Sequence, residues 1–217
     1  MAMPRLDIFP EDQMHYAYGI YLFKSRHPLV RRLKKVAQPS VHGHRPWASS
    51  FLLMDWLQEN PLPTGSRVLE LGCGWGPASV YCASQQQAKV TGLDIDDSVF
   101  PYLDMLAAAN DCKVKPLHAA FADLGDKQLA KFDTLIGADI CFWDGLTDEL
   151  LALFKRARKA GVKQILLADP GRTTFVKLRD ECERRWPDSV SHDFWYALQP
   201  KRFEGQILRL QFNTAES

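Results

Sequence analysis

VLELGCGWGPAS, at residues 68–79, decides the fold of this chain, because an apolar segment runs directly into a glycine-rich turn and then into a helix-forming segment. Residues 68–71 predict a short buried strand, and residues 77–84 predict a helix that begins with a proline, which suits its first turn. Gly72 and Gly74 let the backbone turn tightly and approach a ligand with no Cβ in the way. In a parallel α/β sheet, such a turn lies where a nucleotide-like ligand binds, outside the carboxyl end of the first strand.

Short apolar segments alternate with longer helix-forming segments through most of the chain. Strands are predicted at residues 68–71, 89–93, 113–118, 134–138 and 165–168, and helices at residues 46–57, 77–84, 97–109, 146–160 and 173–185. This alternation predicts βαβ units and a mostly parallel sheet that is covered by helices on both faces. The tail has strand-like residues 190–198 and 206–212 with no helical pattern between them, which predicts an antiparallel hairpin at one sheet edge.

Length and charge favour one domain with a short basic extension. The chain has 217 residues, 46% of them hydrophobic, so it can bury one substantial core, which we place at residues 46–217. Residues 1–45 form the predicted N-terminal basic extension, because no acidic residue interrupts the basic run from Lys24 to Arg45. We expect a helix at residues 28–36 to pack on the core domain, rather than to bind substrate, through Leu29, Val30, Leu33 and Val36. The net charge of +1 gives no global signal for nucleic-acid binding.

Cysteine and histidine spacing argues against disulfides and metal sites. The five cysteines are an odd number without C-x-x-C spacing, so reduced and mostly buried thiols are expected. His42 and His44 have no third ligand at a suitable spacing, and we assign no metal. The N-terminus lacks the apolar core of a signal peptide, and no apolar run approaches the roughly 18 residues of a membrane span. A soluble cytoplasmic protein without a membrane partner is expected, and its oligomeric state is left open.

Glycine spacing separates the candidate cofactors. The dinucleotide fingerprint G-x-G-x-x-G would require glycine at position 77, where this chain has proline, and the phosphate loop G-x-x-x-x-G-K-[ST] is absent. Residues 70–76 instead form E-x-G-x-G-x-G, which resembles the first motif of Rossmann-like, or class I, S-adenosylmethionine-dependent methyltransferases. Glu70 can accept hydrogen bonds from the methionine ammonium, directly or through water, whereas a carboxylate there would repel a pyrophosphate.

Two further acidic positions fit the same class. Asp94 lies at the end of the second predicted strand, eighteen residues after Gly76, which is near the distance expected for a carboxylate that holds both ribose hydroxyls. Asp96 is the lesser candidate because it lies past the strand end. After the third strand, enzymes of this class often place an acidic residue at the adenine amino group, and Ala122-Asp123 resembles that position. A helix N-cap is an equally good interpretation of Asp123.

Residues 139–143, DICFW, follow the fourth predicted strand, where enzymes of this class select the methyl acceptor. Enzymes that methylate adenine or glutamine amide carry N-P-P-Y or D-P-P-Y there. The D-x-x-F found here resembles the D/E-x-x-Y/F motif of the seven-strand protein-lysine methyltransferases, including those acting on the electron-transfer flavoprotein β subunit. RPWASS at residues 45–50 resembles the tryptophan-containing helix that these enzymes place over the cofactor, and ADPGRTTF at residues 168–175 resembles their D-P-G-R segment. The tryptophan that many relatives carry after the third strand is missing from residues 122–125.

This resemblance implies an α/β fold and a cofactor site. The implied fold is a Rossmann-like, seven-stranded, mostly parallel sheet in the order 3-2-1-4-5-7-6, with the last strand antiparallel and helices on both faces. The implied cofactor is S-adenosyl-L-methionine, with S-adenosyl-L-homocysteine as the product. The implied cofactor-binding residues are Trp47, Glu70, Gly72, Gly74, Gly76, Asp94, Ile95, Ala122, Asp123 and Ala138.

The same resemblance implies three catalytic residues. Asp139 would steer a lysine ammonium and take part in its deprotonation, and Phe142 and Trp143 would border the cation through cation–π contacts. Plain packing between loop and core is the other interpretation of the two aromatic residues. Cys141 has no preceding proline or helix N-terminus to lower its pKa, so it is expected to be inert rather than a nucleophile.

The predicted function is therefore methyl transfer from S-adenosylmethionine to a lysine of a protein substrate. A small-molecule N- or O-methyltransferase is the nearest alternative, because a fold does not fix the substrate. An RNA methyltransferase is supported only by the basic stretch at residues 24–45, so nucleic acid is not the favoured partner. A non-catalytic subunit that binds adenosylmethionine is the third alternative, although retention of Asp139 and of the loop glycines favours an active enzyme.

Overall fold

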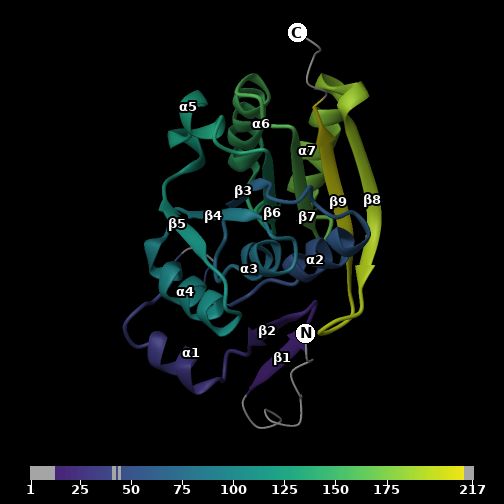
Figure 1. Cartoon of the computed structure of the whole chain (residues 1–217). Coiled ribbons are helices and arrows are strands. Elements are labelled where there is room, and N and C mark those ends of the chain that lie inside the picture. The colour runs from purple at the N-terminus through teal and green to yellow at the C-terminus, as the bar shows by residue number, and fades with distance from the viewer. Residues whose placement is uncertain (1–12, 41–42, 44, 213–217) are drawn as a thin grey trace.

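The computed structural model, which describes residues 13–40, 43 and 45–212, contains a seven-stranded sheet between two layers of helices (Figure 1). The strands of this sheet are β3 (Arg67–Leu71), β4 (Lys89–Asp94), β5 (Val114–His118), β6 (Thr134–Ala138), β7 (Gln164–Asp169), β8 (Val190–Ala197) and β9 (Phe203–Gln211). They lie in the order β5-β4-β3-β6-β7-β9-β8.

The strand order confirms the predicted topology. The five strands from β5 to β7 pair in parallel, whereas β9 is antiparallel to both β7 and β8. Numbered by chain order within this sheet, the strands follow 3-2-1-4-5-7-6, with the last strand antiparallel and the predicted hairpin at one edge. The order reverses beside β3, which pairs with β4 on one side and β6 on the other. A ligand crevice is therefore expected at the carboxyl ends of β3, β4 and β6.

Helices cover both faces of the sheet and form two apolar cores. The helices of the first face are α2 (Ser49–Glu59), α3 (Pro77–Ser84) and α4 (Phe100–Ala109), and those of the second are α5 (Asp126–Leu129), α6 (Asp144–Lys159) and α7 (Thr173–Arg185). Side chains of β3 alternate between the two cores, with Val68 in the first and Leu69 in the second. The central strands are buried on both faces, which explains why their sequences are apolar runs rather than alternating patterns.

Several helix ends differ from the prediction for identifiable reasons. Helices α3 and α7 begin and end where predicted, but α2 begins at Ser49 instead of Pro46. The carboxylate of Asp139 accepts a hydrogen bond from the Ser49 amide at 3.0 Å and so caps the helix from another loop. The predicted helix at residues 97–109 is divided into a 3₁₀ turn at Asp97–Val99 and α4, because Asp96 caps the turn through the Ser98 amide.

The N-terminal segment contains a hairpin that the sequence patterns did not predict. It consists of β1 (Met14–Ala17) and β2 (Ile20–Phe23), joined by Tyr18 and Gly19, which both have positive φ. Ile20 is fully buried in the first core, so the described part of the extension packs on the domain. This turn lacks the Asn-Gly or Asp-Gly signal that usually marks such hairpins.

The basic helix α1 (Pro28–Leu33) is shorter than predicted. Val30 is fully buried, but Val36 is 83% exposed and Leu29 is 44% exposed, so the predicted apolar side was wrong for these two residues. The helix ends at Leu33, so Val36 lies outside it and does not extend its apolar side. Residues 1–12, 41, 42 and 44 of the predicted extension lie outside the described residues.

Gly76 provides a stability test of the glycine loop. It has a φ of +74°, and an added Cβ would lie 2.0 Å from Cδ1 of Leu103, which is fully buried. We expect Gly76→Ala to lower the free energy of unfolding by roughly 2–5 kcal/mol, since left-handed strain and overpacking add. Gly65 has a φ of +75° with no atom within 4 Å of the added Cβ, so Gly65→Ala should cost only the strain of about 1–2 kcal/mol. Equal losses for the two variants in urea unfolding would contradict the packing role of Gly76.

Candidate active site

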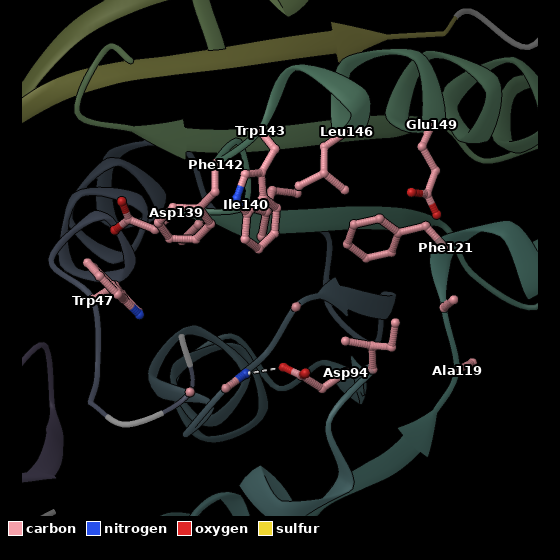
Figure 2. Close-up of a pocket in the computed structure, with 16 residues that line it drawn as sticks. Trp47, Asp94, Ala119, Phe121, Asp139, Ile140, Phe142, Trp143, Leu146 and Glu149 are labelled. Carbon is pink, nitrogen blue, oxygen red and sulfur yellow. Dashed lines mark hydrogen bonds between the residues drawn. The ribbon is translucent and has the colours of Figure 1, made fainter. Parts of the chain in front are cut away.

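A pocket opens at the carboxyl ends of β3, β4 and β6, where the strand order reverses (Figure 2). Its walls come from the glycine loop, the ends of β4 and β6, the loop after β5 and the first turns of α6. The sixteen lining residues are Gly43, Trp47, Gly72, Gly74, Asp94, Ile95, Ala119, Ala120, Phe121, Ala138, Asp139, Ile140, Phe142, Trp143, Leu146 and Glu149.

The glycine loop brings its backbone to the pocket at two positions. Gly72 has a φ of +62°, and an added Cβ would lie 2.9 Å from the Ile140 side chain. Gly74, with a φ of +53°, donates its amide to Oδ2 of Asp94 at 2.9 Å. Gly76 does not line the pocket and instead lets α3 pack against Leu103. The loop therefore leaves an open cradle that side chains would fill.

Asp94 has the position and the free acceptor capacity needed to bind hydroxyl groups. Its side chain ends β4 at the pocket wall, where Oδ2 binds the Gly74 amide and Oδ1 accepts from the Asp96 amide at 3.0 Å. Burial raises the pKa of this carboxyl. A carboxylate has about four lone-pair sites, so these backbone hydrogen bonds leave acceptor capacity for a ligand hydroxyl. Asp96 does not line the pocket, and its carboxylate binds the amide and hydroxyl of Ser40.

Glu70 lies behind the glycine loop and does not line the pocket. Its side chain is buried, and Oε2 accepts from the Ser79 amide at 2.9 Å and from the Ser79 hydroxyl. The carboxyl group therefore holds the first turn of α3 against β3. Burial raises its pKa to about 8. The structure thus places this predicted cofactor residue one layer away from the pocket wall.

The raised pKa of Glu70 makes a testable contribution to stability. The folded-state pKa of about 8 exceeds the ordinary glutamate pKa of about 4.5. The stabilising effect of the proton is therefore complete below pH 4.5 and is lost as the pH rises through 8. Glutamine carries no titratable proton, so Glu70→Gln should not lose this stability as the pH rises. The free energy of unfolding of Glu70→Gln minus that of wild type should therefore increase by about 3–5 kcal/mol between pH 5 and pH 8.5. Urea unfolding of both proteins at the two pH values measures this difference, and a pH-independent difference would contradict it.

The loop after β5 contributes different residues from those predicted. Ala119, Ala120 and Phe121 line the pocket, whereas Ala122 and Asp123 are exposed and do not. The Asp123 carboxylate accepts from the Ala120 amide at 2.9 Å and closes the 3₁₀ turn at Phe121–Asp123. Of the two interpretations of Asp123, the geometry matches the capping one.

Asp139 belongs to a buried ion cluster at one end of the pocket. Its Oδ1 lies 2.7 Å from Nη1 of Arg172, and the same Nη1 lies 2.6 Å from Oδ2 of Asp169. Both carboxylates are almost fully buried. Since two carboxylates share one guanidinium, the cluster carries a net negative charge beside the pocket. Asp139 also has a φ of +57°, a conformation that asparagine and aspartate tolerate better than other non-glycine residues.

Three aromatic side chains lie beside Asp139 (Figure 2). The ring of Phe142 makes an edge contact with Trp47 at 5.4 Å between centroids and a tilted contact with Trp143 at 5.8 Å. The Arg172 guanidinium lies over the Phe142 ring at 4.6 Å, which links the ion cluster to the aromatic wall. Trp143 is half exposed, so this wall reaches solvent.

Other chemistries find less support among the described residues. All five cysteine thiols are free, and burial raises the pKa of Cys141, which makes it a poor nucleophile. In residues 13–40, 43 and 45–212, no group of three or more potential ligands could hold a metal ion. His42 and His44 lie outside that part of the chain. No helix within the described segments is long and apolar enough to cross a bilayer.

Several lining residues were missed by the sequence interpretation. Gly43 reaches the pocket because its carbonyl accepts from Nε1 of Trp75 at 2.7 Å, a long-range bond that no motif indicates. Leu146 and Glu149 lie one turn apart on α6, and the helical spacing from Trp143 could have placed them on one face.

The fold and this site define a class of protein. Residues 68–161 match a family described as "Methyltransferase domain", which covers the glycine loop, Asp94 and Asp139. The strand order, the cradle of Gly72 and Gly74 and the acceptor Asp94 fit an adenosine-containing ligand in the crevice. Residues 68–161 therefore form a methyltransferase domain with the class I fold, and the cofactor of this class is S-adenosylmethionine, with S-adenosylhomocysteine as product.

Within this class, the chain is similar to electron transfer flavoprotein beta subunit lysine methyltransferases. It is 27% identical to the Xenopus laevis protein over 130 residues, which cover 59% of this chain and 52% of that one. For the Danio rerio protein, the identity is 25% over 157 residues, or 68% of this chain and 59% of the relative. The matched segment thus spans little more than half the length of these relatives. The structure of a human methyltransferase 10 domain containing protein has the same fold, with a TM-score of 0.60 at 13% identity, covering 84% of this chain and 94% of that one.

Proposed function

We propose that this chain transfers the methyl group of S-adenosylmethionine to the side-chain amine of a protein lysine. The observation that carries this proposal is the end of the pocket where Asp139 and the aromatic residues Trp47, Phe142 and Trp143 lie together. Aromatic faces and a net negative cluster both attract an alkylammonium, and each cation–π contact contributes about 0.5–2 kcal/mol.

In this proposal, the residues of the chain act mainly by positioning. When bound, S-adenosylmethionine supplies an electrophilic methyl carbon on a sulfonium. Asp139 and the aromatic wall would direct the lysine nitrogen along one line of approach, and such alignment can contribute roughly 7–11 kcal/mol to the lowering of the barrier. The lysine ammonium would first lose a proton to water, and the neutral nitrogen would then form the N–C bond with its lone pair while the electron pair of the broken C–S bond leaves with sulfur. The methylated nitrogen would keep the positive charge as an ammonium.

In this proposal, Asp139 has two roles. Its carboxylate already binds Arg172 and the Ser49 amide, so it orients the aromatic wall and α2 as well as supplying negative charge. Each oxygen keeps acceptor capacity for the substrate ammonium or for a water that removes its proton. The lysine assignment also draws on the names of the relatives, which describe lysine methyltransferases.

The proposal is tested by labelling a lysate of the host cell with methyl-labelled S-adenosylmethionine and the purified chain. We expect labelled material that protease destroys and ribonuclease does not, and methyl-lysine after acid hydrolysis. Label that ribonuclease removes would favour an RNA acceptor, and label confined to small molecules would favour the other alternative. Either outcome would contradict a protein-lysine acceptor.

A further inference from the structure

We infer that Glu149, instead of an acidic residue in the loop after β5, recognises the exocyclic amino group of the cofactor's adenine. The inference rests on the adenosylmethionine cofactor and on the proposed acceptor end at Asp139, but not on lysine as the acceptor. The residue that the sequence motif predicts for this contact does not line the pocket. Asp123, the residue that the sequence motif offers for this contact, is exposed and bonded to the Ala120 amide. Residues 119–125, which form that loop, therefore bring no carboxylate to the pocket.

The two ends of the pocket have different chemistry. Figure 2 shows Trp47 and Asp139 at one end, Phe121 and Glu149 at the other, and Asp94 between them on the opposite wall. The methyl group must face the acceptor, which places the sulfonium toward Asp139. With the ribose at Asp94, the adenine then lies toward Phe121 and Glu149. The apolar side chains of Ile95, Phe121 and Leu146 line this region, as a planar base requires.

Glu149 is the carboxylate at the adenine end of the pocket. It lies on α6 one turn after Leu146, and its side chain extends toward the pocket beside Phe121 (Figure 2). Within residues 13–40, 43 and 45–212 it forms no hydrogen bond or ion pair.

The neighbours of Glu149 do not satisfy its charge. The helix positions three and four residues away hold Gly145, Leu146, Ala152 and Leu153, so no basic side chain stands beside it on α6. The closest basic residue along this face, Arg156, is already engaged with the carbonyls of Phe121 and Leu124 at 3.0 and 3.1 Å.

A carboxylate at this position can recognise the 6-amino group of the base. The 6-amino group of adenine donates hydrogen bonds, and an ionised carboxylate only accepts them. The base of an inosine analogue has an acceptor oxygen at the same position. Two acceptors would then face each other, and no hydrogen bond could form. A hydrogen bond to a charged group, once lost, weakens binding by roughly 10- to 100-fold. Glu149 therefore makes the pocket selective for adenine over a 6-oxopurine.

Calorimetric titration with S-adenosylhomocysteine and with S-inosylhomocysteine tests this selectivity. Wild type should prefer the adenine compound by at least about tenfold. In Glu149→Gln the ratio should fall to within about threefold, because the amide can turn and donate to the 6-oxo group. Asp148→Asn, which removes the same charge from the exposed neighbour on α6, should keep the wild-type ratio.

Three results would overturn the inference. The first is a wild type that binds both compounds with equal affinity. The second is a Glu149→Gln variant that keeps the wild-type ratio of the two affinities. The third is an Asp123→Asn variant that loses this ratio. If Glu149→Gln keeps the ratio but raises the KM for the methyl acceptor, Glu149 binds the acceptor and not the base. Because binding is measured without an acceptor, failure of this inference remains distinguishable from failure of the lysine proposal.

Discussion

Replacing Asp139 with asparagine should lower the rate of methyl transfer by about two to four orders of magnitude, the range for losing an acid–base partner. The variant keeps the shape of the side chain and tolerates the φ of +57°, so it adds no backbone strain. It removes the negative charge that attracts an ammonium, and it leaves Arg172 with Asp169 as its remaining carboxylate. The rate is measured with saturating S-adenosylmethionine and, once known, the protein acceptor.

The same substitution should also cost stability, because Asp139 binds Arg172 and the Ser49 amide. A loss of about 1–3 kcal/mol is expected, since Arg172 keeps one partner and is not left as an unpaired buried charge. Asp169→Asn is the matched variant, because it removes the same charge from the same cluster but does not line the pocket. It should cost similar stability and a much smaller part of the rate. Equal rate losses in both variants would show that Asp139 acts only through the ion cluster.

Replacing Asp94 with alanine should weaken binding of S-adenosylhomocysteine by roughly 10- to 150-fold, or about 1.5–3 kcal/mol. The variant deletes a charge-assisted acceptor at the ribose position and also frees the Gly74 amide, which the carboxylate now holds at 2.9 Å. Both effects act on the ligand cradle, whereas the acceptor end of the pocket is unchanged.

Asp97 offers a matched control for Asp94. It is a highly exposed carboxylate three residues further along the chain, and its Oδ2 lies 4.0 Å from Nδ1 of the exposed His118 ring. Asp97→Ala changes the net charge equally and should leave the affinity within about twofold, because exposed charge pairs contribute little. If Asp94→Ala and Asp97→Ala bind S-adenosylhomocysteine alike, the assignment of Asp94 to the ribose is wrong.

Local patterns predicted the sheet well because each of its central strands is a self-contained apolar run. Residues 68–71 and 134–138 are buried on both faces, so their composition alone identifies them, and the topology follows from the class they resemble. The cradle glycines were predictable for a similar reason. Gly72 and Gly74 have positive φ, and glycine is the residue type that adopts this conformation most easily, so the residue type itself indicates the turn.

The parts that escaped prediction depend on contacts between distant segments. Asp139 caps α2 from ninety residues away, and this contact decides that the helix begins at Ser49. Glu70 and Asp123 have the residue type that the motif requires, but their carboxylates are taken by Ser79 and Ala120. A motif gives the identity of a side chain, whereas its orientation depends on which donors the folded chain brings within reach.

The most direct test of the account is a calorimetric titration of the wild-type protein with S-adenosylmethionine, S-adenosylhomocysteine and NAD. The geometry of the Gly72 and Gly74 cradle with Asp94 predicts that both adenosyl compounds bind with one-to-one stoichiometry and that NAD does not bind. Tight binding of NAD together with no binding of either adenosyl compound would contradict the account.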